Sequence, residues 1–167
     1  MKGQGAHIIL TRDDAKRVFG GPDDAAVRKI VTELRNSPKH RASKLVLETG
    51  TAWDGIHRCL TDGTLDATAG DFPVNHAILG GKRLHRGPEF EAIMVRPDIV
   101  PHVAEALHCQ KRHEMHVKFM QLDPVSFGHA PTDREFDKTW NLLQQIRQLF
   151  EDAANERCAV LFTVDRE

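Results

Sequence analysis

The sequence predicts an α+β fold in which a small mixed β-sheet is covered by several helices, as one domain over residues 1–167. Short apolar runs typical of strands lie near the start, in the middle and at the end of the chain, and segments with helical periodicity separate them. A chain of 167 residues is long enough to bury about two-thirds of its unfolded surface. No internal repeat or linker divides it, so we expect a single compact domain.

The composition is that of an ordinary globular protein. Hydrophobic residues make up 40% and charged residues 28%, which argues against disorder. The 23 basic and 24 acidic residues leave a formal net charge of −1, too little to gather nucleic acid. The apolar run near the start is too short for a signal peptide or a membrane span. Three cysteines, Cys59, Cys109 and Cys158, form no CxxC pair, so we expect a cytoplasmic protein without disulfides.

The first part of the chain predicts one strand and two helices. Residues 6–10 read as a short buried strand, and Thr11 with Asp14 three positions later resembles a capping box that opens a helix. Asp23 and Asp24 complement the positive end of a second helix. The apolar stripe of that helix consists of Val27, Ile30, Val31 and Leu34.

The middle of the chain alternates loops with a helix and a strand. Residues 36–44 are basic and predict a solvated loop, with a partner-facing patch as the alternative. The next helix begins near Trp53 and ends at Gly63, because glycine enters the left-handed conformation freely. A long loop over residues 64–73 follows, and the alternating residues 89–95 predict a strand.

The last part of the chain is mainly helical. Residues 98–119 have helical periodicity, either unbroken or with one break, and residues 124–131 predict a loop. Thr132 and Glu135 form a capping box that opens a long helix. Its apolar side chains include Phe136, Trp140, Leu143 and Phe150. Residues 158–164 are continuously apolar, which predicts an interior strand covered on both faces.

Residues 53–63 combine an apolar helical stripe with groups that can bind or react. On a helix, Trp53, Ile56, His57 and Leu60 share one stripe, and Asp54, Arg58 and Thr61 share a neighbouring one. We expect Trp53 to anchor the core against the long helix that contains Trp140. Gly55 beside it suggests close approach by another element, and His57 should be at least half buried and hydrogen-bonded.

The same segment also supports a functional cleft. Asp54 could orient His57 or pair with Arg58, whereas Cys59 lies about 200° from His57 around the helix and does not face it. Gly80 and Gly81 mark a turn or a close backbone approach. The candidate binding cleft comprises His7, Asp54, His57, Arg58, Gly80 and Gly81.

The sequence contains no complete catalytic or metal-binding motif of a familiar kind. His113 to His116 reads HExH and lacks the zincin spacing, and Gly80-Gly81-Lys82 lacks the spacing of a phosphate-binding loop. On one helix, His102 and His116 would lie about 21 Å apart, too far to share an ion. The histidine stripe would face water, opposite the apolar side. We therefore assign no catalytic residue, no cofactor and no metal.

Several blocks in the correct order make the chain resemble the YfbM-like family of small uncharacterised bacterial proteins. The matching blocks are residues 7–11 (HIILT), 52–63 (AWDGIHRCLTDG), 77–81 (AILGG), 100–107, Trp140, 153–154 and 159–165 (AVLFTVD). The chain departs from the family in Thr51, where lysine is usual, and in having no tyrosine. The resemblance implies a compact α+β fold and no established catalytic residue.

Two hypotheses on function follow. The leading one is a non-enzymatic binding or interaction protein with a protein partner, such as an immunity-type protein that neutralises a toxin. The alternative is an enzyme or a small-ligand-binding protein with a cleft around His57 and Arg58. Neither nucleic acid nor a membrane is expected as a partner, and the sequence specifies no oligomeric state.

Overall fold

An antiparallel sheet forms the centre of the molecule in the computed structural model, which describes residues 2–166. Its strands have the order β2-β1-β5-β4-β3. They are β1 (Gln4–Leu10), β2 (Val46–Gly50), β3 (Lys82–Arg83), β4 (Phe90–Val95) and β5 (Ala159–Asp165). The α+β class is confirmed, but all described pairings are antiparallel, so the expected mixed sheet is wrong. Apolar runs identify strands without encoding their direction, which depends on how the connecting helices cross the sheet.

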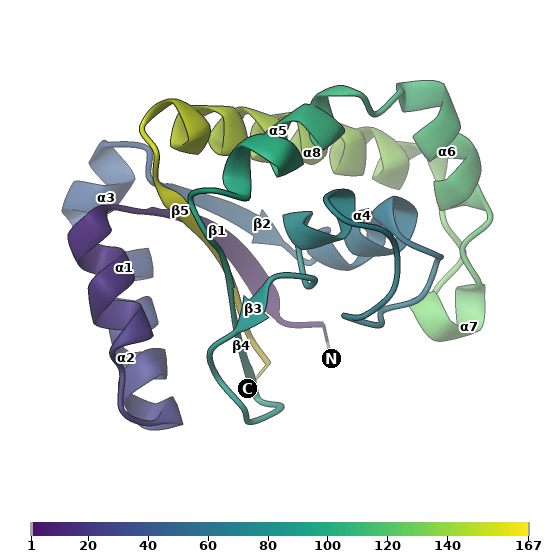
Figure 1. The fold of residues 1–167 in the computed structure, drawn as a ribbon. Coiled ribbons are helices and arrows are strands. Elements are labelled where there is room, and N and C mark those ends of the chain that lie inside the picture. Colours follow the sequence, from purple (N-terminus) through teal and green to yellow (C-terminus); the bar gives the residue numbers. More distant parts are fainter. Residues whose placement is uncertain (1, 167) are drawn as a thin grey trace.

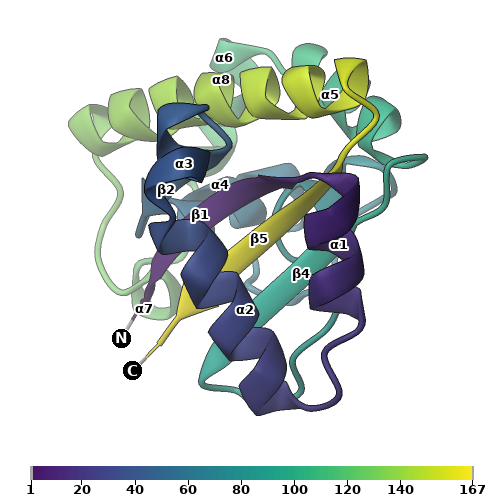
Figure 2. The ribbon, with the colours of Figure 1, turned by 90° about the vertical axis from the view of Figure 1, so that its left-hand side faces the viewer.

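Helices cover both faces of the sheet (Figure 1, Figure 2). On one face, α1 (Arg12–Phe19) and α2 (Asp24–Asn36) share an apolar cluster with Ile8, Leu10 and Leu161. The larger cluster, on the other face, is formed with α4 (Trp53–Leu60), α5 (Val100–His108), α6 (Arg112–Met120), α7 (Pro124–Phe127) and α8 (Asp133–Asn155). Within residues 2–166, no helix combines the length and the apolar character needed to cross a bilayer.

The helix starts that the sequence indicates are confirmed at atomic detail. The Thr11 side chain accepts a hydrogen bond from the backbone N–H of Asp14 at 3.2 Å, and Thr132 does the same for Glu135 at 3.2 Å. Asp23 accepts from the N–H of Ala26 at 2.8 Å. Each bond satisfies a donor that the first turn of a helix leaves without an intrahelical partner.

Two segments predicted as loops contain short helices instead. α3 (Pro38–Ala42) lies within residues 36–44, and α7 lies within residues 124–131. In both cases a capping side chain, Ser37 or Asp123, precedes a proline at the first helical position. Proline is favoured there because it fixes φ and its missing N–H would be unpaired anyway. The segment over residues 98–119 is broken, since α5 ends at His108 and α6 begins at Arg112.

The predicted interior strand and the predicted core tryptophan are both confirmed. β5 lies between β1 and β4, and only the last of its residues, Asp165, is not buried. Trp53 is 1% exposed, and its ring centroid lies 5.6 Å from that of Phe162 on β5. The indole N–H donates to the Gly3 carbonyl at 2.9 Å. Trp53 therefore packs on the sheet, within the same cluster as Phe136 and Leu143 of the long helix α8.

Candidate functional site

A buried ion pair lies at the centre of the segment that the sequence singles out. Arg58 Nε donates to Asp54 Oδ1 at 2.5 Å across one turn of α4, and both side chains are buried. Lys2 Nζ lies 3.5 Å from the other oxygen of Asp54. Of the two roles considered for Asp54, the structure therefore shows the pairing with Arg58.

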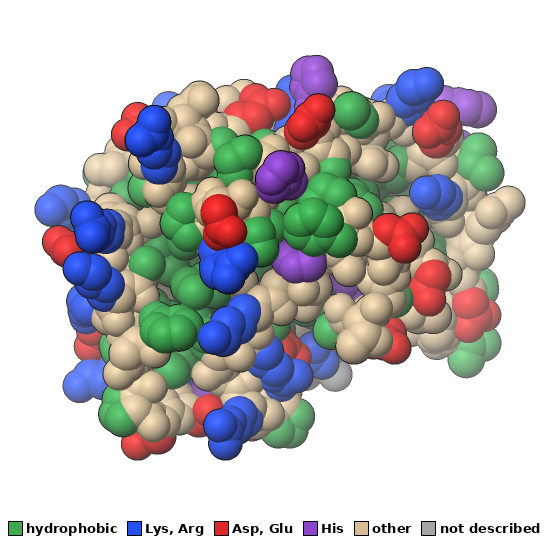
Figure 3. Space-filling view, in the orientation of Figure 1, with side chains coloured by type: hydrophobic (Ala, Val, Ile, Leu, Met, Phe, Trp, Pro, Cys, Tyr) green, Lys and Arg blue, Asp and Glu red, His purple; other side chains and the backbone are tan. Residues whose placement is uncertain are grey.

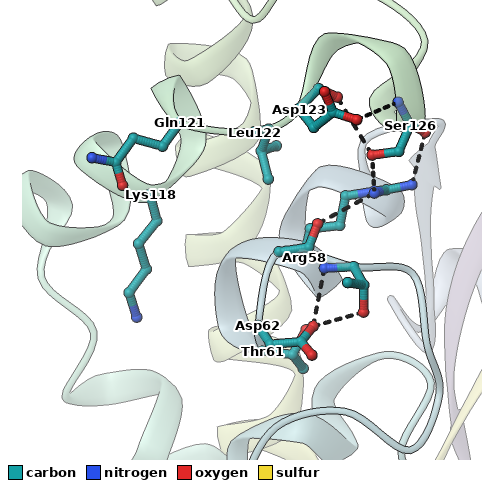
Figure 4. Close-up of a pocket in the computed structure, with 10 residues that line it drawn as sticks. Arg58, Thr61, Asp62, Lys118, Gln121, Leu122, Asp123 and Ser126 are labelled. Carbon is teal, nitrogen blue, oxygen red and sulfur yellow. Dashed lines mark hydrogen bonds between the residues drawn. The ribbon is translucent and has the colours of Figure 1, made fainter.

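The remaining donors of Arg58 connect α4 to α7. Nη2 donates to the Ser126 carbonyl at 3.1 Å, and Nη1 lies 3.3 Å from both the Ser126 hydroxyl and the Gly63 carbonyl. Figure 4 shows these bonds converging on one guanidinium. Because every nitrogen of Arg58 has a protein partner, its first role is to hold α7 and the turn after α4 in place.

A cavity of about 610 Å³ opens beside this guanidinium. It is lined by Arg58, Thr61, Asp62, Gly63, Thr64, Lys118, Gln121, Leu122, Asp123 and Ser126. Hydrogen bonds from Thr64 lower the pKa of Asp62, and hydrogen bonds from Ser126 lower the pKa of Asp123. Both carboxylates are thus ionised at neutral pH and already stabilise local turns. Lys118 from α6 brings an ammonium group to the opposite wall (Figure 4).

His57 and Cys59 are withdrawn from this cavity. His57 is buried, as expected, and its Nε2–H donates to the Asp66 carbonyl at 2.8 Å. Burial lowers the pKa of His57, so the ring is neutral at pH 7. Burial also raises the pKa of the Cys59 thiol to about 12, which leaves it unreactive as a nucleophile.

The six predicted cleft residues are not gathered around one cavity. Arg58 lines the cavity described above, and Asp54 lies behind it. His7 is buried, and its Nε2–H donates to the Ala77 carbonyl at 2.7 Å, with its pKa lowered to about 4 by burial. Gly80 is required for close packing, since a Cβ there would lie 2.4 Å from the Asn75 carbonyl oxygen. A Cβ at Gly81 would lie 2.7 Å from the Met94 carbonyl oxygen.

The histidine-rich segment lies outside the core, as predicted. His102, Cys109 and His113 are exposed, and His116 is half buried. His116 Nε2 lies 2.7 Å from Asp133 Oδ1, and its ring packs on Phe136. Over residues 2–166, the histidine, cysteine and acidic side chains form no group of three or more that could hold a metal ion.

An apolar groove that the sequence did not predict lies at the end of the sheet where β1 and β4 finish and β5 begins. We call it the Phe19 groove; it has a volume of about 520 Å³. Its lining consists of Leu10, Arg12, Ala15, Lys16, Phe19, Met94, Pro97, Arg157, Cys158 and Ala159. Phe19 is 58% exposed. The sequence does contain a signal for the exposure of Phe19. Phe19 follows Val18, the buried apolar residue of α1, and successive residues of a helix point about 100° apart, so the two side chains cannot both face the core.

The rim of the Phe19 groove is basic. Arg12, Lys16 and Arg157 are exposed, and within the described part of the chain they form no ion pair with a carboxylate. The nearby Asp98 pairs with Arg96 at 3.0 Å instead. Figure 3 shows this side of the molecule, where Lys and Arg side chains surround an area of hydrophobic side chains in the left half of the view.

Comparisons with known proteins place the fold but name no activity. No curated protein matches the chain. The fold is similar to that of YfbM from Escherichia coli, a protein of unknown function, with a TM-score of 0.64 and 14% sequence identity over 96% of this chain and 99% of that one. At this identity the similarity concerns the fold, and it confirms the YfbM-like resemblance. Since the family model for a domain of unknown function, DUF1877, matches residues 1–163, the chain belongs to the DUF1877 family.

Proposed function

We propose that the protein is a non-enzymatic binding protein that docks onto a partner protein, in the manner of an immunity protein that neutralises a toxin. The observation that supports this proposal is the Phe19 groove, an apolar hollow with an exposed aromatic ring and a rim of cations without carboxylate partners. Exposed apolar surface bordered by polar groups is typical of interaction sites. Aromatic and arginine side chains are also enriched in protein interfaces.

The occupant we infer is a partner protein with an acidic contact surface. Carboxylates on the partner would pair with Arg12, Lys16 and Arg157, which would raise the association rate and select against basic partners. Because three free cysteines are stable as thiols in a reducing compartment, we place this interaction in the cytoplasm.

The test is a binding measurement with the product of the adjacent gene, because toxins and their immunity proteins are commonly encoded side by side. Isothermal titration calorimetry would compare the wild type with Phe19→Asp and Phe72→Asp. Phe72 is a matched control, since it is 57% exposed but lies outside the groove. We expect binding that Phe19→Asp weakens at least tenfold and Phe72→Asp leaves unchanged. Equal losses in both variants, or no binding, would contradict the proposal.

Small-molecule binding is a second candidate, favoured by the cavity beside Arg58. Its volume of about 610 Å³ is within the range of small-ligand pockets, and Lys118 supplies a charge for an anionic ligand. A thermal-shift screen with small carboxylates tests it. Stabilisation that Lys118→Ala removes and Lys138→Ala retains would support this function, whereas no stabilisation by any compound would count against it.

A further inference from the structure

We propose that the Phe19 groove recognises a short segment of its partner in which a large apolar side chain is flanked on both sides by carboxylates. This inference rests on the proposed function and specifies the chemistry of the partner at the same site. It follows from the floor of the groove, from the placement of its cations and from one residue that occupies a strained backbone position.

The floor of the groove accepts an apolar anchor. Leu10 and Ala159 are paired in neighbouring strands, and Met94 comes from the next strand, β4. All three side chains belong to the apolar cluster that also includes residues of α1 and α2, and none is more than 8% exposed. A volume of about 520 Å³ accommodates an aromatic or leucine side chain together with part of its backbone. Filling it would remove Phe19 from water, which is the main source of affinity in such pockets.

The cations lie on two different walls of the Phe19 groove. Arg12 and Lys16 lie one turn apart on α1, whereas Arg157 lies in the turn between α8 and β5. Lys82 of β3 adds a fourth cation, with Nζ 4.6 Å from the centre of the Phe19 ring. If an apolar side chain of the partner enters the groove between these walls, the residues before and after it in the partner segment lie next to cations. Carboxylates at those positions would form charge-assisted hydrogen bonds.

Arg157 has a backbone conformation that disfavours a side chain. Its φ is +54°, in the left-handed region, at the position after the C-terminal end of α8 where glycine is the usual residue. An arginine there costs stability relative to glycine. We infer that arginine is present at this position because its guanidinium, at the rim of the groove, contributes to binding.

A second copy of this chain does not suit the groove. In a two-fold contact the same surface meets itself, so the cations of one groove would face those of the other. Like charges brought together disfavour association. The charge pattern therefore selects an acidic partner segment.

NMR titrations of the full-length protein with synthetic peptides test the inference. The probes are a nine-residue peptide with Leu-Phe flanked by Asp and Glu, a matched peptide with Lys at the acidic positions, and an acidic peptide with Ala replacing Leu-Phe. Octanoate serves as a small apolar anion. We expect the first peptide to shift the amide signals of Leu10, Ala15 and Ala159, with a Kd at least tenfold below that of the other probes.

Variants separate recognition from folding. Lys16→Glu should weaken binding of the acidic peptide at least tenfold, and Lys138→Glu on α8 should leave its binding unchanged. Arg157→Gly should weaken binding several-fold while the melting temperature stays equal or rises, because glycine relieves the left-handed strain. A fall in melting temperature for this variant would show that Arg157 serves the fold and would contradict its role in binding.

The outcomes distinguish this inference from the proposed function. If the basic peptide binds the groove as well as the acidic one, the inferred chemistry is wrong, while docking through Phe19 stands on the partner titration alone. If octanoate binds and no peptide does, the segment proposal is overturned in favour of a small apolar anion. If no probe shifts the groove signals, the inference is wrong regardless of how the partner titration turns out.

Discussion

Replacing Trp53 with alanine should remove a large part of the stability of this protein. The side chain is 1% exposed, and an aromatic side chain buries about 150–250 Å². At about 25 cal/mol per Å², that area corresponds to about 4–6 kcal/mol, of which alanine retains a small part. Loss of the indole hydrogen bond to Gly3 adds about 1 kcal/mol. Measured costs of such truncations are about 3–5 kcal/mol, which is our expectation for Trp53→Ala.

Urea unfolding followed by circular dichroism measures this free energy. Trp140→Ala is the control, because Trp140 is only half buried on α8 and should cost less than half as much. If Trp53→Ala does not fold, Trp53→Phe retains most of the buried area and should cost about 1–2 kcal/mol. A melting temperature unchanged in Trp53→Ala, together with a lost interaction, would refute the reasoning and make α4 a binding surface.

Three further outcomes follow from buried groups. Arg58→Met should cost about 3–5 kcal/mol in urea unfolding because it leaves the buried Asp54 carboxylate with only the more distant, partly exposed Lys2 as a counter-ion. The exposed Arg17→Met should cost less than about 1 kcal/mol, and equal costs would contradict the buried pair. Burial holds the pKa of His7 near 4, below its unfolded value of 6.5, so unfolding takes up a proton between these values. Stability should therefore fall by up to about 3 kcal/mol as pH drops from 6.5 to 4, and His7→Gln should flatten this slope. A thiol reagent at pH 8 should modify exposed Cys109 in the native protein, and Cys59 only after denaturation, as mass spectrometry of the labelled peptides would show.

Local chemistry explains why much of the fold could be predicted. The caps at Thr11 and Thr132 depend on residues within one helical turn, so the sequence alone contains the donor and the acceptor. The burial of Trp53 and of β5 follows from apolar character that only a core can satisfy. α3 and α7 are also predictable from local sequence, since a capping side chain followed by proline indicates the start of each helix.

The candidate site was less predictable because it depends on residues distant in sequence. Arg58 could be recognised as one partner of Asp54, but its bonds to Ser126 span 68 positions of the chain. His7 seemed a cleft residue by its chemistry, yet the fold pairs it with the carbonyl of Ala77, 70 positions away. The hydrophobic periodicity of one segment does not predict contacts with residues so distant in the sequence.

The sequence by itself determined where the helices begin, which strand is interior and which side chains must be buried, because these properties depend on hydrogen bonds within a turn and on the transfer of apolar groups from water. Only the tertiary structure decided that the strands are antiparallel, that Asp54 and Arg58 near Trp53 form a buried ion pair, and that three cations line the groove beside Phe19 at the end of the sheet. Those features arise where segments far apart in the chain meet, and the relative placement of packed elements is set by the whole core.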